Sequence, residues 1–141
     1  MSKINFYKFA LQAAKIAESK KAADTVILDI QKLTTVANYF VITTAESTLQ
    51  INAICDEIEK QFKISNLKPL RREGVSSASW RVIDFGGILV HVMSPAIRAA
   101  YSFEKLWSSA DIVKLEETKN EVVKKIVKKK STLLKSKSKK Q

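Results

Sequence analysis

The chain has 141 residues with a hydrophobic fraction of 45% and an aromatic fraction of 8%, which fits one globular domain and excludes both wholesale disorder and a disulfide-stapled miniature. Its formal net charge of +11 would indicate nucleic-acid binding only if the charge were spread over the fold. A single cysteine, the lack of an apolar run of roughly 18 to 20 residues and an N-terminus unlike a signal or transit peptide predict a soluble, cytoplasmic protein without a membrane partner.

The first half of the chain predicts a helix, two strands and a second helix. Apolar residues recur at helical spacing over Ile4–Ser19, which defines an amphipathic helix. The β-branched runs Val26–Ile30 and Tyr39–Thr43 predict two strands. Ser47 is expected to cap a second amphipathic helix, and Cys55 falls on the buried face of that helix.

Two strands joined by a glycine pair follow in the second half. Residues 80–85 and 88–93 flank Gly86-Gly87, and such a loop predicts a hairpin because its primed turn needs positive φ. The hairpin register divides the side chains between two faces. The apolar face holds Ile83, Phe85, Ile88, Val90 and Val92, with Arg81 at its end. The mixed face holds Trp80, Val82, Asp84, Leu89, His91 and Met93.

The segments around the hairpin complete the domain. Pro69–Gly74 is a connection before it, and Ser94 followed by Pro95 opens a short helix after it. A further helical turn is expected over Phe103–Trp107. The order of elements predicts an α/β (α+β) fold, with a mixed sheet of four or five strands and helices mainly on one face.

Most of the positive charge lies in the C-terminal segment. Residues 112–141 contain 11 Lys and 3 Glu, a net charge of +8, whereas residues 1–111 carry a net charge of +3. The segment has too few large apolar residues for a core of its own. We therefore expect a domain over 1–111 and a Lys-rich extension over 112–141, either helical or disordered. The extension either keeps the protein soluble or assists binding to something rich in RNA.

These elements bring no catalytic groups together. Cys55 is expected in the core, while Asp84 and His91 lie on the opposite face of the sheet. One histidine and one cysteine exclude an ordinary zinc site, and no glycine-rich phosphate loop is present. We expect no catalytic, cofactor or metal site. The mixed face of the hairpin is then either a protein interface anchored by Trp80 or a face covered by a C-terminal helix.

Several sequence blocks, in this order and spacing, resemble the ribosomal silencing factor family, also called Iojap-like proteins. The blocks are Leu28-Asp29-Ile30, Leu33-Thr34, Ala37–Ile42, Ser47, Gln50, Pro69–Gly74, Trp80–Asp84, Val90–Met93, Arg98, Tyr101 and Glu104–Trp107. They cover about residues 5–108. The sequence departs from the family at Asn38, Ala45 and Gly87, where the family usually has Asp, Gly and Asp.

The resemblance implies a nucleotidyltransferase-like fold without the transferase's active site. It implies binding to the large ribosomal subunit through ribosomal protein number fourteen (L14 family), at the surface where the small subunit joins. Blocking that joining would repress translation when nutrients are scarce. The residues that the resemblance assigns to partner binding are Trp80 as the anchor, with Val82, Asp84, Leu89, His91, Met93, Arg98 and Tyr101.

Other functions remain open at this point. An organellar relative would act in ribosome assembly, and an RNA-binding module would act through the Lys-rich extension, which is also where rRNA contact is expected. A degenerate nucleotidyltransferase around Ser47 is opposed by the missing acidic pair. The free protein is also compatible with a homodimer.

Overall fold

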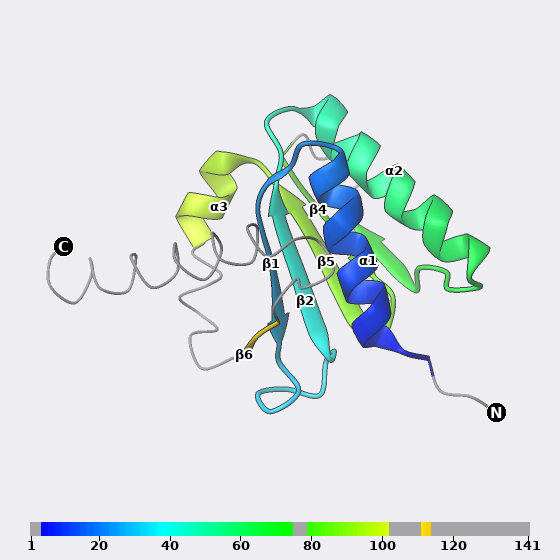
Figure 1. The fold of residues 1–141 in the computed structure, drawn as a ribbon. Helices are drawn as coiled ribbons and strands as arrows, with labels where there is room; N and C mark the ends of the chain where they lie inside the picture. The colour runs from blue at the N-terminus through cyan, green and yellow to red at the C-terminus, as the bar shows by residue number, and fades with distance from the viewer. Residues whose placement is uncertain (1–3, 75–78, 102–110, 114–141) are drawn as a thin grey trace, which may run out of the picture.

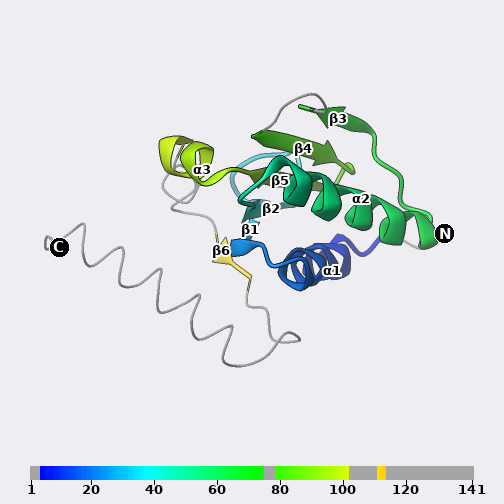
Figure 2. The same cartoon turned by 90° about the horizontal axis from the view of Figure 1, so that it is seen from above.

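The computed structural model describes residues 4–74, 79–101 and 111–113 (Figure 1). In these ranges the helices are α1 (Phe6–Ser19), α2 (Thr48–Ile64) and α3 (Pro95–Tyr101). The strands are β1 (Ala23–Asp29), β2 (Tyr39–Thr44), β3 (Arg71–Glu73), β4 (Trp80–Asp84), β5 (Ile88–Met93) and β6 (Asp111–Ile112). They form one mixed sheet in the order β3-β4-β5-β2-β1-β6. Helices α1 and α2 lie on the same face of the sheet, which confirms the predicted fold class (Figure 2).

Both long helices begin at side-chain caps. The Asn5 side chain accepts a hydrogen bond from the backbone N–H of Lys8, and the Ser47 hydroxyl accepts one from that of Gln50, each at 3.1 Å. Each bond satisfies an N–H group that the first helical turn leaves without an intrahelical partner. The cap at Ser47 was predicted. Helix α1 was predicted from Ile4, and it begins two residues later because Asn5 takes the capping position.

The predicted hairpin and its register are confirmed. Trp80 pairs with Met93 and Asp84 pairs with Leu89, so the two faces alternate as expected. Gly86 has a φ of 97°, the conformation that requires glycine at this turn. Strand β5 also pairs with β2 in parallel, which joins the hairpin to the N-terminal half of the chain. The mixed face of the hairpin therefore lies on the side of the sheet away from α1 and α2, called the outer face below.

Two short edge strands raise the number of strands in the described residues to six, where four or five were expected. Strand β3 lies inside the predicted connection Pro69–Gly74, and its three residues are charged and exposed, so they carry no apolar alternation. Strand β6 pairs with β1 and lies across the predicted boundary at residue 111. That boundary stays a prediction. The turn expected over 103–107 and nearly all of the Lys-rich extension lie outside the described residues.

The sheet carries buried side chains on both faces. The main core lies under α1 and α2 and includes Cys55 and Phe62. A second cluster lies on the outer face. It consists of Leu28, Ile30, Ala37, Phe40, Ile42 and Met93. Ile97 of α3 packs against this cluster. On the outer face the side chains of β1 and β2 in this cluster are buried, whereas Trp80, Val82 and Leu89 of β4 and β5 are partly exposed. Among the described residues, no helix combines the length and apolarity needed to span a membrane.

Candidate functional site

The open part of the outer face presents an aromatic and aliphatic surface. Trp80 and Val82 come from β4, Leu89 from β5 and Tyr101 from the end of α3. Trp80, Val82 and Leu89 are partly exposed, and Tyr101 is 50% exposed. We call these four residues the outer patch. Large aromatic side chains that are held in place but accessible are typical anchors of protein interfaces.

Trp80 contacts two other rings. Its ring centroid lies 4.8 Å from that of Tyr101 and 6.3 Å from that of His91. The indole N–H donates to Nδ1 of His91 at 3.4 Å, a long hydrogen bond. The inner side of the indole also packs against the second cluster. Because its orientation is fixed before any partner arrives, Trp80 loses little conformational entropy on binding.

His91 and Met93 lie beneath this surface rather than on it. The sequence-based interpretation placed both around the tryptophan at the contact, but Met93 is fully buried and His91 is 6% exposed. Burial lowers the pKa of His91 from its ordinary 6.5 to about 4, so the imidazole is neutral at physiological pH. Phe40 packs against the imidazole with ring centroids 4.9 Å apart. The two residues support Trp80 from below. The hairpin register showed which face they occupy but not what covers that face.

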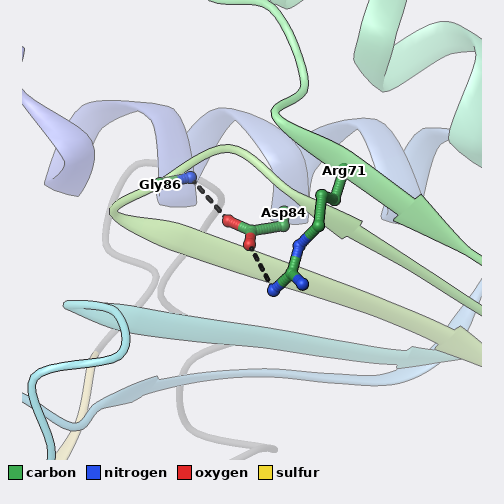
Figure 3. Close-up of polar contacts among 3 residues, drawn as sticks. All are labelled: Arg71, Asp84 and Gly86. Atoms are coloured by element: carbon green, nitrogen blue, oxygen red, sulfur yellow. Dashed lines mark hydrogen bonds and ion pairs between the residues drawn. The ribbon is translucent and has the colours of Figure 1, made fainter.

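Asp84 is already engaged within the protein. One carboxylate oxygen accepts the backbone N–H of Gly86 at 2.8 Å, and the other lies 3.4 Å from Nη2 of Arg71 (Figure 3). The first contact stabilises the hairpin turn, in the manner of an Asx turn. Asp84 was expected to meet a basic group on a partner; the structure supplies a basic group from β3. Arg71 is a neighbour of the outer patch that the sequence-based interpretation missed, because β3 was not predicted.

Arg98 fixes the helix that carries Tyr101. Its Nη1 donates to the Thr44 hydroxyl at 2.8 Å, which ties α3 to the end of β2. The hydroxyl of Ser94 accepts the N–H of Ile97 at 3.2 Å and caps α3 as predicted. Arg98 therefore acts on the outer patch through the position of α3, and Tyr101 is the residue of α3 that reaches the patch.

The groups that suit nucleophilic catalysis stay apart, as expected. Cys55 is fully buried in the main core, and burial raises the pKa of its thiol to about 12. His91 and Asp84 belong to the other face of the sheet, so neither can deprotonate this thiol. Within the described ranges, no group of three or more His, Cys, Asp or Glu side chains is arranged to hold a metal ion.

The fold and the outer patch together define an α/β domain suited to contact with another macromolecule. The model of the family described as "Ribosomal silencing factor during starvation" matches residues 4–140. The chain is 35% identical over 104 residues to ribosomal silencing factor RsfS of Bacillus subtilis, covering 74% of this chain and 88% of that one. The chain belongs to the ribosomal silencing factor family.

Two further comparisons extend this likeness. A protein from Chromobacterium violaceum with a crystal structure is 30% identical and superposes with a TM-score of 0.71, over 74% of this chain and 88% of that one. The chloroplastic protein Iojap of Zea mays is 33% identical over 111 residues, which cover 76% of this chain and 46% of the maize protein. The family thus includes bacterial and organellar members.

Proposed function

We propose that this protein binds the large ribosomal subunit through the outer patch, with ribosomal protein number fourteen as the direct partner. Bound there, it blocks association with the small subunit and represses translation under nutrient limitation. The proposal locates the protein in the cytoplasm with its ribosomes. The observation that carries it is the partly exposed Trp80, in contact with the rings of Tyr101 and His91 on a face that α1 and α2 leave uncovered.

The properties of the outer patch suit such a role. Trp80 and Tyr101 offer large contact areas with few rotatable bonds, and Val82 and Leu89 add aliphatic surface beside them. The pair of Arg71 and Asp84 supplies a polar rim. Inhibition by steric exclusion needs an occupied surface and no reacting groups. This mechanism is therefore compatible with the separation of Cys55 from His91. The protein acts without enzymatic activity in this proposal.

The protein is expected to cosediment with isolated large subunits and not with assembled ribosomes, because it and the small subunit compete for one surface. The measurement is recovery of the protein in gradient fractions after mixing with each purified particle. Isolated small subunits serve as the matched control. Recovery with small subunits equal to that with large subunits would contradict the proposal.

A second candidate function is that of an organellar ribosome assembly factor of the same family; the likeness to the chloroplastic protein of maize favours the organellar location. An assembly factor would be recovered preferentially with immature large-subunit particles, whereas a silencing factor would be recovered with mature ones. The same sedimentation experiment, performed on both kinds of particle, separates the two functions.

The Lys-rich extension is expected to add salt-sensitive affinity by contact with rRNA. Lysines that neutralise phosphates release counterions, so binding falls more steeply as salt rises. Deleting residues 120–141 removes nine lysines and should flatten the slope of log K against log salt, while binding at low salt remains detectable. Equal slopes for the full-length and shortened proteins would show that the extension serves solubility alone. A shortened protein without any specific binding would instead indicate an RNA-binding module that acts through the extension.

A further inference from the structure

Positive charge within residues 1–111 is concentrated in one short stretch. Residues 60–74 contain five basic residues and one acidic residue, a net charge of +4. The remaining residues of 1–111 carry a net charge of −1. Residues 60–74 therefore account for all of the net positive charge of residues 1–111, which is separate from the charge of the Lys-rich extension.

The fold places this stretch along one side of the molecule. It comprises the last turn of α2, the connection to β3, and β3 itself, which is an edge strand of the sheet. Figure 2 shows the chain leaving α2 and returning to β3 on the side of the sheet away from β6. Lys60, Lys63, Lys68 and Arg71 are all exposed there, and we call these four residues the basic edge.

The turn inside the basic edge is rigidly built. The N–H of Leu67 donates to the carbonyl of Phe62, and the N–H of Asn66 donates to the carbonyl of Lys63, both at 2.9 Å. With Asn66 at a φ of 67°, these bonds form a Schellman motif, and Leu67 is buried beneath it. These bonds fix the backbone between Lys63 and Lys68, so the two exposed lysines extend from an ordered turn.

The two arginines of β3 differ in how far they are neutralised. Arg72 forms a two-pronged ion pair with Glu59 of α2, with both N–O distances at 2.8 Å. Arg71 meets Asp84 at a single distance of 3.4 Å, and 72% of its side chain is exposed. Because Asp84 borders the outer patch, Arg71 makes the basic edge continuous with that patch.

Stabilisation of helix α2 does not explain the presence of every cation in the basic edge. Lys63 lies in the last turn of α2, where a cation is favoured by the helix dipole. Lys68 and Arg71 follow the helix and gain nothing from it. Two apolar side chains lie exposed among the basic ones, Ile64 at 76% and Leu70 at 69%. Cations with apolar side chains beside them can contact both the phosphates and the less polar parts of a polynucleotide.

We propose that the basic edge binds the phosphate backbone of rRNA next to the protein contact made by the outer patch. This inference rests on the proposed function, because it assigns a second partner at the same docking position. The outer patch supplies specific recognition of a protein, and the basic edge supplies an electrostatic contact whose strength depends on salt. Both surfaces engage together because Arg71 and Asp84 join them.

The test is charge reversal in the full chain, Lys63→Glu with Lys68→Glu. The matched control is Lys8→Glu with Lys15→Glu, which changes two exposed lysines of α1 by the same charge. Affinity is measured between 50 and 200 mM salt for purified large subunits and for isolated ribosomal protein number fourteen. The edge variant should lose about 10-fold in affinity for subunits at low salt and flatten the salt slope by about two, since each phosphate contact contributes roughly 0.9. Its affinity for the isolated ribosomal protein should stay unchanged.

If the edge and control variants lose equal affinity for large subunits, the effect comes from net charge alone, and the proposal is overturned. A loss for the isolated ribosomal protein would make the basic edge a protein contact and also overturn it. If the unaltered chain fails to bind the isolated protein while the edge variant alone loses subunit affinity, the proposed partner is wrong and the rRNA contact stands. The neutral pair Lys63→Gln with Lys68→Gln removes the same two phosphate contacts without adding negative charge, so it should also flatten the salt slope by about two, with an unaltered thermal midpoint.

Discussion

Replacing Trp80 with alanine is expected to weaken binding to isolated ribosomal protein number fourteen by about 30-fold or more, because a central interface tryptophan is often worth about 2 kcal/mol or more. The unfolding free energy should fall by less than the roughly 3–5 kcal/mol typical of a fully buried tryptophan, since the indole is only partly buried. The affinity and the urea midpoint of the variant are measured side by side.

A matched control separates this effect from a general loss of apolar surface. Leu49 is 81% exposed at the start of α2, on the other layer of the molecule, so Leu49→Ala should change neither the affinity nor the midpoint. A Trp80 variant that binds normally, or one that barely folds, would show that the outer patch is not the contact. Tyr101→Ala tests the support of the indole and should weaken binding less than Trp80→Ala, because the tryptophan itself remains.

The stability of the protein is expected to fall by about 3 kcal/mol as the pH decreases from 6.5 to 4, through His91 alone. Burial holds the pKa of His91 at about 4 in the folded protein, against an ordinary value of 6.5. Between these values the unfolded chain takes up a proton that the folded protein rejects. Above pH 6.5, His91 thus leaves the unfolding free energy unchanged. Between pH 6.5 and pH 4 it lowers the unfolding free energy by a growing amount, which stays constant below pH 4.

Urea unfolding of the unaltered protein and of His91→Gln, measured at several pH values from 7 to 4, checks this. The glutamine variant lacks the titrating ring but keeps a side-chain acceptor for the indole N–H of Trp80. The difference in unfolding free energy between the two proteins should shift in favour of the variant as the pH falls. A constant difference across the whole range would mean that His91 titrates alike in the folded and unfolded states.

The parts of the fold with strong local signals were predictable from the sequence. The hairpin register followed from Gly86-Gly87 and the alternation around it, and it assigned Trp80 to the outer face correctly. The caps at Ser47 and Ser94 followed from residue type alone. These features depend on neighbours within a few residues, so the sequence displays their causes directly.

Features that depend on distant parts of the chain were not predictable. Strand β3 is charged and exposed, and it exists because Arg71, Arg72 and Glu73 pair with β4. The burial of Met93 and His91 depends on the second cluster, whose members other than Met93 come from β1, β2 and the loop between them. The ion pair of Arg71 with Asp84 required the position of β3 to be known. The alternation of residues along a strand shows which side chains share a face. Whether that face is buried depends on how distant parts of the chain pack against it.

The shortness of the two edge strands limits how this protein can self-associate. β3 has three residues, all charged and exposed, and β6 has two, so the described sheet offers little free backbone for another strand to extend it. Continuous sheet formation between molecules, the usual route to aggregation, is thereby disfavoured even though an apolar surface is open to solvent. Within the part of the chain that the structure describes, the surfaces left for a homodimer of the free protein are the side chains on the faces of the domain, and if the homodimer used the outer patch, ribosome binding and dimer formation would be mutually exclusive.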